Sequence, residues 1–316
     1  MMTGLPTADE AIRLLERQLA EWPEARARYE ALDHVCERTL EWETFSVRVQ
    51  WNPARIASSA AKVDAQSLSR RPCFLCPAHL PAEQLRREVA DEYQLLVNPF
   101  PIFPMHWTVP ARMHVPQTMK GRWPVWAALT KAVRPLVVCY NGPRCGASAP
   151  DHFHWQLGTP GFLPVEQDRT RVERRWVKDE PHLRVYALKN YLRQALFVES
   201  DDEVRLAEAL ERIVGDLPCA PGEAEPGMNV LAWWGEEGGV ACVLPRRKHR
   251  PACYEATDET HRLISPGAVD MGGVLITPRR EDYERLTAAE IEQIYEEVSL
   301  ADEAMDRWLE SIAAHR

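Results

Sequence analysis

The chain has 316 residues, of which 45% are hydrophobic and 27% are charged, the composition of an ordinary globular protein. Collagen-like, low-complexity and wholly disordered chains are therefore excluded. The formal net charge of −9 argues against a general nucleic-acid binder, although a few clustered basic side chains are enough to hold a phosphate group. We expect a cytoplasmic protein, because no apolar run is long enough to span a bilayer and the N-terminus lacks the apolar core of a signal peptide.

The first predicted element is a helix. Thr7 and Glu10 have the spacing of a capping box, apolar residues recur at helical intervals as far as Trp22, and Pro23 limits the helix. A polar stretch rich in serine and alanine, residues 57–71, is then expected to cross the surface.

Short runs rich in β-formers and cut by prolines follow. They read YQLLVNPFPIFP from Tyr93 onward, then HWTVPARMHVP, LVVCYNGP and DHFHWQLGTP. This pattern predicts strands of an antiparallel sheet with tight connections.

After Pro164 the chain becomes more charged, and helical and strand-like segments alternate. A Pro/Gly-rich loop is predicted at residues 217–227, and strands return in MNVLAWW, GGVACVLPRRKHRP and GGVLITPRR. The helix predicted before this loop has a buried stripe formed by Val204, Leu206, Leu210 and Ile213.

The last predicted helix begins at a second capping box, Thr287 and Glu290. Its apolar residues lie along one face: Ile291, Ile294, Val298, Met305 and Leu309.

Two pairs of segments are similar to each other. TVPARMHVP, residues 108–116, matches VLPRRKHRP, residues 243–251, in the pattern Pro-x-Arg-x-His-x-Pro, and DHFHWQLGTP and DMGGVLITP end alike in the same order. Two ordered matches favour a duplicated α+β unit, with a first half at residues 1–165 and a second at residues 166–316. The second copy has glycines where the first has paired histidines, so the first half is expected to supply the chemistry.

The most informative segment is His152-Phe153-His154-Trp155-Gln156. Alternate residues of a strand share a face, so the two histidines and the glutamine are expected on one side and the aromatic residues on the other. A polar stripe on a solvent-facing edge strand would have the same pattern. Two histidines together with a glutamine nevertheless favour a catalytic or metal site.

The residues just upstream offer groups that bind phosphate. Asn141, Arg144 and Ser148 lie in or beside the glycine-containing segment NGPRCGAS, where backbone N–H groups and a guanidinium could hold phosphate oxygens beside the imidazoles. The alternative is a β-turn with a surface arginine.

Of the eight cysteines only Cys73 and Cys76 are closely spaced. Three interpretations of this pair are open: two metal ligands, a redox-active pair or two buried thiols. A thioredoxin-like role is disfavoured, because the pair does not lie in a βαβ pattern. Two thiolates and two imidazoles would complete a tetrahedral zinc site.

The segment GASAPDHFHWQ, together with CFLC and LLVNPFPIFPMHWTVPARMHVPQ, resembles the active-site region of the histidine-triad superfamily. The similarity is to the branch with a His-x-His-x-Gln motif: galactose-1-phosphate uridylyltransferase, diadenosine tetraphosphate phosphorylase and GDP-L-galactose phosphorylase. It extends from Cys73 to Leu286 and is densest before Gly161. It implies a duplicated α+β unit, with an antiparallel sheet and flanking helices.

The resemblance also implies a role for the motif residues. His154 would attack the α-phosphorus of a nucleotide and form a covalent nucleotidyl-histidine, and inorganic phosphate or a sugar 1-phosphate would then accept the nucleotide. Gln156, Arg144 and Ser148 would bind phosphate oxygens as charge develops on them.

A structural Zn²⁺ is implied by the same resemblance, and its ligands would be Cys73, Cys76, His114 and His152. His79 and His106 are close to these residues in sequence and are alternative ligands. A second metal site, as in some uridylyltransferases, is not supported, because the later histidines form no His-x-His pair.

Substrate contacts are also expected from Asn98, in LVNPFP, and from Arg247, in the basic run 246–250. The alternatives are a turn-forming asparagine and a solvated charge run. A homodimer is expected, because subunits of this family often share active-site residues, whereas neither a nucleic acid nor a membrane is expected as a partner.

The functional prediction is a nucleotidyltransferase or nucleotide phosphorylase that acts on a nucleoside-diphosphate sugar or a dinucleotide. One alternative is a histidine-triad hydrolase, in which water accepts the nucleotide; Gln156 argues against it, because those hydrolases usually have a third histidine there. The other alternative is a non-catalytic nucleotide- or zinc-binding module.

Overall fold

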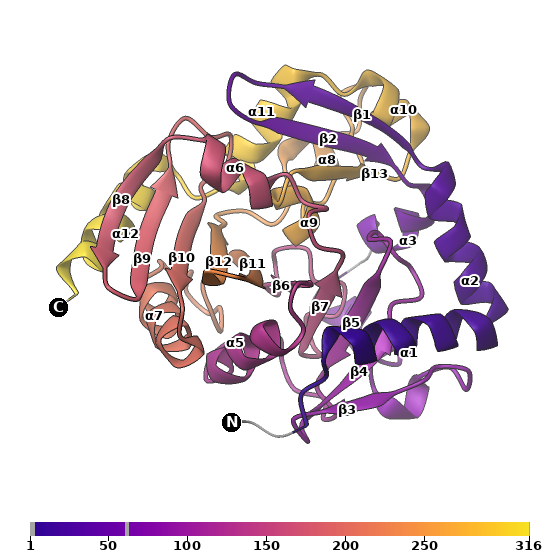
Figure 1. Ribbon diagram of the computed structural model, residues 1–316. Coiled ribbons are helices and arrows are strands. Elements are labelled where there is room, and N and C mark those ends of the chain that lie inside the picture. Colours follow the sequence, from indigo (N-terminus) through magenta and orange to yellow (C-terminus); the bar gives the residue numbers. More distant parts are fainter. Residues whose placement is uncertain (1–3, 61–62, 316) are drawn as a thin grey trace.

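The computed structural model describes residues 4–60 and 63–315 and has two sheets flanked by helices (Figure 1). The strands are β1 (Cys36–Glu41), β2 (Ser46–Trp51), β3 (Arg87–Val89), β4 (Tyr93–Val97), β5 (His106–Pro110), β6 (Val137–Asn141), β7 (His154–Gly158), β8 (Arg174–Glu180), β9 (Leu183–Leu188), β10 (Leu196–Ser200), β11 (Met228–Gly235), β12 (Gly238–Pro245) and β13 (Val274–Thr277). The helices are α1 (Ala8–Glu21), α2 (Pro23–Glu30), α3 (Ile56–Ser59), α4 (Ala65–Arg70), α5 (Trp123–Ala132), α6 (Val165–Arg171), α7 (Glu203–Gly215), α8 (Ala252–Glu255), α9 (Ala268–Met271), α10 (Arg280–Arg285), α11 (Ala288–Val298) and α12 (Asp302–Ala314). Among the described residues, none of these helices has both the length and the apolar character that crossing a membrane requires.

The large sheet has the strand order β3-β4-β5-β7-β6-β11-β12-β10-β9-β8, and all of its neighbouring strands are antiparallel. Each half of the chain supplies five adjacent strands, and the halves meet where β6 pairs with β11, with Tyr140 opposite Val230. A small sheet, β1-β2-β13, joins the N-terminal hairpin to a strand of the second half. The predicted α+β class is confirmed.

The strand order confirms the duplication. In the first half a hairpin β4-β5, the helix α5 and a hairpin β6-β7 give the sheet order β4-β5-β7-β6. In the second half a hairpin β9-β10, the helix α7 and a hairpin β11-β12 give β9-β10-β12-β11. Strand β12 therefore occupies the place that the His-x-His-x-Gln strand β7 has in the first half. Its sequence GGVACVLP contains no histidine.

The predicted pairing of similar segments is wrong. Residues 108–116 leave β5, whose counterpart is β10, whereas residues 243–251 leave β12, whose counterpart is β7. DMGGVLITP ends in β13, which lies in the small sheet, parallel to β2. The two segments share the Pro-x-Arg-x-His-x-Pro pattern because each is the end of a strand followed by a similar turn. They do not occupy equivalent positions in the repeat.

The two faces of the large sheet are covered differently (Figure 1). One face packs against α1, α5, α7 and α12 and buries Trp107, Trp155 and Leu157. The other faces the small sheet, α9 and α11, and carries Cys139, which lies opposite Gln156 on β7. The polar residues of β7 thus lie on the face that the small sheet and short helices cover incompletely.

Both predicted capping boxes are present, at Thr7 before α1 and at Thr287 before α11. The last predicted helix is two helices, α11 and α12. The chain extends between them, because Ser299 bridges to Arg246 and the Leu300 N–H donates to the carbonyl of Pro245 at the end of β12. In α7 the expected buried stripe is present except for Val204, which is 60% exposed.

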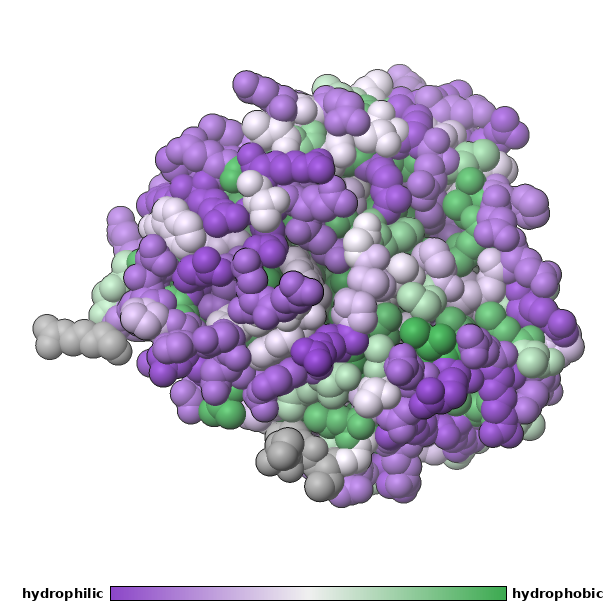
Figure 2. Space-filling model, viewed as in Figure 1, coloured by the Kyte–Doolittle hydropathy of each residue, from purple (hydrophilic) through white to green (hydrophobic). Residues whose placement is uncertain are grey.

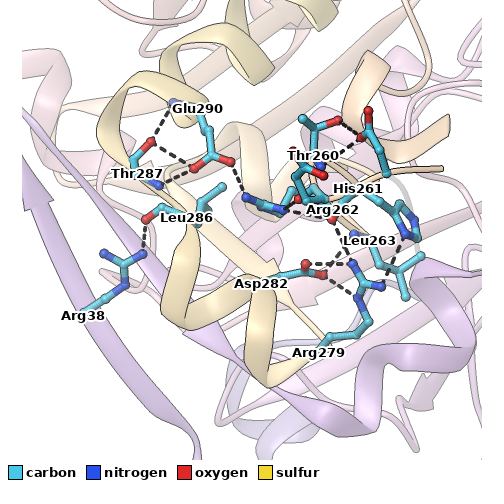
Figure 3. Close-up of polar contacts among 12 residues, drawn as sticks. Arg38, Thr260, His261, Arg262, Leu263, Arg279, Asp282, Leu286, Thr287 and Glu290 are labelled. Carbon is cyan, nitrogen blue, oxygen red and sulfur yellow. Dashed lines mark hydrogen bonds and ion pairs between the residues drawn. The ribbon is translucent and has the colours of Figure 1, made fainter. Parts of the chain in front are cut away.

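A polar network holds the loop of residues 256–267 against α10 and α11 (Figure 3). The buried Asp282 carboxylate accepts from the Arg279 guanidinium at 2.7 Å and from the Leu263 N–H at 3.0 Å. Arg262 donates to Glu290 of the capping box at 2.6 Å. Charge-assisted bonds of this kind are among the stronger ones in proteins, so the loop is fixed at one end while its other end reaches the cavities described below.

The loop predicted at residues 217–227 contains neither helix nor strand and is anchored by Glu225. The Tyr140 hydroxyl donates to its Oε1 and the Met119 N–H donates to its Oε2 at 2.8 Å. Burial raises the pKa of this carboxyl to about 7.

The stability of the protein is expected to fall as the pH rises through the interval in which Glu225 ionises. Between about 4.5 and 7 the folded protein retains a proton that the unfolded chain has released, so ionisation costs up to about 3 kcal/mol of unfolding free energy above pH 7. Glu225→Gln keeps an oxygen that can accept from the Met119 N–H and gains an NH₂ group that can donate to the Tyr140 hydroxyl oxygen, and it cannot ionise. Urea unfolding at pH 5, 6, 7 and 8 should show wild type losing stability relative to the variant as pH rises. Burial also raises the pKa of Asp270 to about 6. This residue is present in both proteins, so its effect on stability cancels in the comparison. A stability difference between wild type and Glu225→Gln that stays constant from pH 5 to pH 8 would contradict the raised pKa of Glu225.

Candidate active site

His154 is the first residue of β7, and its ring is held as one defined tautomer. Its Nδ1 lies 2.9 Å from the carbonyl oxygen of His152, and because a carbonyl only accepts, Nδ1 carries the proton. The Nε2 atom is therefore an unprotonated nitrogen with a free lone pair. Burial lowers the pKa of this imidazole to about 4, so the ring is neutral near pH 7.

Gln117 holds the start of β7 in place. Its side-chain oxygen accepts from the His154 N–H at 2.8 Å, and its amide group donates to the carbonyls of His154 and Asn141 at 2.9 Å each. The residue is almost wholly buried. Sequence analysis gave no reason to single it out, because an isolated glutamine in a loop has no local signature.

The orientation of the Gln156 amide is set by His106. The Ile102 N–H donates to Nδ1 of His106 at 3.1 Å, so its Nε2 carries the proton and donates to Oε1 of Gln156 at 2.8 Å. Burial lowers the pKa of His106 to about 3 and keeps the ring neutral. With its oxygen occupied, Gln156 directs its NH₂ group elsewhere, and it borders both cavities described below. His106 is thus not an alternative metal ligand.

Cys73, Cys76, His114 and His152 form one cluster, in which the possible ligand atoms all lie within 4.8 Å of one another. Sγ of Cys73 is 3.3 Å from Nδ1 of His152, and Sγ of Cys76 is 3.2 Å from Nδ1 of His114. Sulfur and nitrogen ligands of one tetrahedral zinc ion are about 3.5 Å apart, so these separations fit the metal. The residues that the sequence assigns to zinc are therefore together in space.

The outer contacts of the cluster suit metal ligation as well. Nε2 of His152 donates to the carbonyl of Ala111 at 2.7 Å, which leaves the Nδ1 lone pair facing the cysteines. Nε2 of His114 lies 3.6 Å from a carboxylate oxygen of Asp151. Ligand histidines are commonly oriented by such partners. His79, the other alternative ligand, lies outside the cluster, and its Nδ1 contacts the Cys73 carbonyl at 2.9 Å.

His152 and His154 do not share one side of a strand as expected. His152 precedes β7, where the chain still turns, and its ring points to the cysteines. The aromatic residues of the motif do pack on the opposite face of the sheet, as predicted.

A cavity of about 430 Å³, here called the first cavity, opens beside His154 and Gln156. Its walls are largely apolar and include Phe74 and Phe100, which are 44% and 42% exposed. Asn98 also lines it and donates to Thr108 Oγ1 at 3.1 Å. Figure 2 shows a mostly hydrophilic face, with hydrophobic side chains at several separate places among the hydrophilic ones.

A second cavity, of about 70 Å³, adjoins the first. The two share Arg55, Ser148 and Gln156 in their walls. The second half of the chain also contributes to the second cavity, through His249 and Arg250 among others. The site is therefore built by both halves, although His154 comes from the first.

The loop of Gly146 to Ser148 lines the second cavity, where it meets the second half. Gly146 has φ of +96°, and a Cβ there would lie 2.5 Å from the Cα of Gly267, so only glycine allows this approach. Within the described residues the N–H groups of Ala147 and Ser148 have no hydrogen-bond partner. Free amides beside a cavity are suited to an anion.

The other predicted substrate contacts line different cavities. Asn141 lines the second cavity, where its Oδ1 accepts from Asn229 and from the Ala268 N–H. Arg144 and Arg247 line neither of these two cavities. Arg144 pairs with Glu223 at 2.8 Å, and Arg247 donates to backbone carbonyls at the end of α11. Both line a third cavity, of about 800 Å³, which adjoins the second.

Two arginines beside the site were missed. Arg55 lies between the first and second cavities and donates to the Phe100 carbonyl at 2.7 Å, and Arg71 lines the first cavity and donates to the Ser148 carbonyl at 2.8 Å. Arg71 ends the polar stretch of residues 57–71, which was expected to cross the surface, and Arg55 lies just before that stretch. A neutral imidazole lone pair, an oriented amide and these guanidiniums together suit nucleophilic attack on a phosphate.

Two family models match the chain, one after the other. "Domain of unknown function (DUF4922)" matches residues 14–159, and "GDPGP1-like, C-terminal domain" matches residues 164–315. A comparison with curated proteins found no match.

Among solved structures, that of yeast Ap4A phosphorylase is similar, with a TM-score of 0.56 and 16% identity over 88% of this chain and 94% of the yeast chain. The same enzyme in complex with Ap4A gives a TM-score of 0.56 and 15% identity over 88% and 97% of the two chains. The complex with AMP gives 0.54 and 17% over 89% and 97%. At this identity the likeness concerns the fold.

Proposed function

We propose that this chain, whose second half matches the GDPGP1-like family model, belongs to the His-x-His-x-Gln branch of the histidine-triad superfamily and is a nucleotide phosphorylase or nucleotidyltransferase that works through a covalent nucleotidyl-His154. The observation that carries the proposal is the tautomer of His154, whose free Nε2 stands beside cavities that can hold the two ends of a nucleotide donor.

The reaction has two displacements. Nε2 of His154 attacks the α-phosphorus, an N–P bond forms, and the bond to the bridging oxygen breaks, so that the leaving phosphoryl compound departs with the electron pair. Inorganic phosphate or a sugar 1-phosphate then attacks the same phosphorus and restores the imidazole. Gln156 and Arg55 stabilise the charge on the phosphoryl oxygens in both steps.

The first cavity is proposed to bind the nucleoside. Phe74 and Phe100 are exposed, and a guanidinium, of Arg71 and Arg28 respectively, lies over one face of each ring. The other face is proposed to stack on the base, and Asn98 to contact the ribose. Yeast Ap4A phosphorylase has been solved with AMP and with Ap4A, which is consistent with a nucleotide ligand for this fold.

A structural zinc ion held by Cys73, Cys76, His114 and His152 is part of the proposal. When bound, it would fix the loop that carries Phe74 next to the start of β7. The chemistry at phosphorus needs no group from the metal, because the nucleophile and the charged groups come from the protein.

The function can be tested by trapping the intermediate. Purified protein is incubated with nucleoside triphosphates and nucleotide sugars labelled at the α-phosphate and is then denatured in base. Label that survives base and is released by acid identifies a phosphoramidate. Release of a nucleoside diphosphate on addition of phosphate would identify a phosphorylase, whereas release of free nucleotide by water alone would favour the hydrolase. Absence of label with every donor, including short quench times, would overturn the covalent mechanism.

His106→Phe is expected to lower kcat about tenfold while leaving KM for the donor within about twofold, because the Gln156 amide loses its fixed orientation. The measurement is steady-state kinetics of His106→Phe, Gln156→Ala and the double variant. If His106 acts only through Gln156, the double variant is no slower than Gln156→Ala. Tyr29→Phe is the matched control, since Tyr29 donates to the backbone carbonyl of His106 and not to its ring. If the losses of kcat in the two single variants add up in the double variant, His106 does not act through Gln156 and has a merely structural role.

The homodimer, the cytoplasmic location and the division of the chain between residues 165 and 166 remain predictions. Size-exclusion chromatography with light scattering would test the first of them.

A further inference from the structure

Asn229 lies at the junction of the two halves of the large sheet. It is the second residue of β11, and its partner across the junction is Asn141, the last residue of β6. Its side chain is wholly buried and lines none of the three cavities described above. A buried amide is costly unless it is hydrogen-bonded, so the bonds of this side chain show what it holds in place.

Arg246 fixes the orientation of the Asn229 amide. Asn229 lies opposite Leu244 of β12, and Arg246 follows Leu244 by two residues, so Asn229 and Arg246 are diagonal neighbours on one face of the hairpin. Nη1 of Arg246 donates to the Asn229 side chain at 2.7 Å. Because a guanidinium only donates, the contacted atom is the amide oxygen, and the NH₂ group of Asn229 points the other way.

The NH₂ group of Asn229 reaches two acceptors in the first half. It donates to Oδ1 of Asn141 at 2.8 Å and to the Cys145 carbonyl at 2.6 Å. Oδ1 of Asn141 also accepts from the Ala268 N–H at 2.7 Å. Two donors thus hold the Asn141 oxygen, and its NH₂ group, which has no hydrogen-bond partner within the described part of the chain, is available to a ligand in the second cavity.

The bond to the Cys145 carbonyl acts on the loop that follows. A peptide unit is planar, so holding this carbonyl also fixes the N–H side of the same unit, where the loop of Gly146 to Ser148 begins. The unpartnered N–H groups of Ala147 and Ser148 belong to that loop. Together with the NH₂ group of Asn141 they form a set of donors beside the second cavity, which suits an anion.

Arg246 also fixes the segments on the other side of the second cavity. The residue is 5% exposed, and its guanidinium donates to five oxygens, none of which belongs to a carboxylate. The acceptors are Oδ1 of Asn229 and the carbonyl oxygens of Val298, Pro266, Lys248 and His249. Pro266 directly precedes Gly267, which Gly146 approaches, and His249 lines the second cavity. One buried side chain therefore holds both the Asn229 amide and the segments that face it.

We propose that Asn229 and Arg246 are positioning residues of the second cavity, which hold the Asn141 amide and the loop of Gly146 to Ser148 as a set of N–H donors for the reacting phosphate without touching it. This inference rests on the proposed function and extends it to the half that lacks the paired histidines. The physical advantage is that donors oriented in advance need no reorganisation when the phosphate binds or when charge develops on it.

Asn229→Asp is the sharpest variant, because it has nearly the same shape and keeps an oxygen for Arg246. The group that faces Asn141 and the Cys145 carbonyl becomes a carboxylate oxygen, which only accepts. The Asn141 amide is then expected to turn, so that its NH₂ group donates to the new carboxylate and its oxygen faces the second cavity. Phosphate binding is weakened, whereas the first cavity is unchanged.

The measurement is calorimetric titration with adenosine and AMP and with guanosine and GMP, and the variants are compared on the pair that wild type binds more tightly. The nucleoside reports on the first cavity, and the affinity ratio of monophosphate to nucleoside reports on the phosphate site. In Asn229→Asp the monophosphate affinity is expected to fall at least about tenfold and the nucleoside affinity to stay within about twofold. Asn52→Asp is the matched control, since Asn52 is also buried but its amide contacts Gln50.

Arg246→Lys tests the second residue and does not depend on the folding of Asn229→Asp. Lysine keeps the positive charge but has its donors on one atom and cannot reach all five acceptors, so a selective loss of monophosphate affinity of about three- to tenfold is expected. Combining Asn229→Asp with Asn141→Ala should cost less than the product of the two single losses, because Asn229 acts partly through Asn141.

Equal losses of nucleoside and monophosphate affinity in these variants would show a merely structural role and overturn the inference, as would an unchanged affinity ratio in Asn229→Asp and Arg246→Lys. Either result leaves the proposed function standing if wild-type protein still becomes labelled on His154. Failure of the proposed function is a different result: no donor labels the wild-type protein. If wild type also binds the monophosphate no more tightly than the nucleoside, the inference fails with it.

Discussion

Replacing His154 by alanine is expected to abolish covalent labelling and to lower kcat by at least about 10³-fold, since the variant has no nucleophile at the phosphorus. Neither His152 nor His106 can take its place. His152 is turned toward the cysteines, and the ring of His106 is engaged by Ile102 and Gln156. The measurements are acid-labile label per protein and steady-state turnover with the best donor.

Binding should survive this substitution, because the first cavity is otherwise intact. AMP affinity of His154→Ala should stay within a few-fold of wild type, which separates loss of chemistry from loss of folding. His182→Ala is the matched control, an exposed histidine paired with Asp201 on the other half of the sheet. Label that persists in His154→Ala would place the nucleophile elsewhere and refute the proposed mechanism.

The second large effect is expected at the cysteine cluster. Purified protein should contain about one equivalent of zinc, and Cys73→Ser should lose it, together with several kcal/mol of unfolding free energy, because metal binding and local folding are coupled. Elemental analysis and urea unfolding measure these quantities. Cys36→Ser is the matched control, since Cys36 is an exposed cysteine outside the cluster.

Loss of zinc should also weaken nucleotide binding. Phe74 and Leu75 lie between the two cysteines and line the first cavity, so a loosened loop removes part of its wall. AMP affinity is expected to fall about tenfold in Cys73→Ser and to remain unchanged in Cys36→Ser. Folded, metal-free wild-type protein with full AMP affinity would contradict the zinc proposal.

Local patterns predicted much of the site because they act over short stretches of chain. The capping boxes at Thr7 and Thr287 depend on residues three positions apart, and alternation along residues 153–157 places the aromatic residues in the core. The ligand set of the cysteine cluster followed from family resemblance, and the structure places all four residues together.

Predictions failed where a distant segment decides the local structure. The last helix breaks because residues 299 and 300 bond to the end of β12, which no helical periodicity reveals. The repeat was matched in the wrong register, because similar turns follow two strands that occupy different places in the sheet. Arg55 was missed because a lone arginine in a polar segment has no pattern.

By itself the sequence determined the class of fold, predicted the family by resemblance and singled out the residue expected to carry the chemistry, because the motif residues lie within five consecutive positions. Only the tertiary structure decided which second-half residues border the site, how His106 orients Gln156 and where Arg144 and Arg247 lie. These depend on contacts between segments 50 to more than 200 residues apart, such as Gln156 with His106 or β2 with β13. The physical reason is that side-chain orientation is set by packing between neighbouring strands, and that packing exists only once segments distant in the sequence have come together.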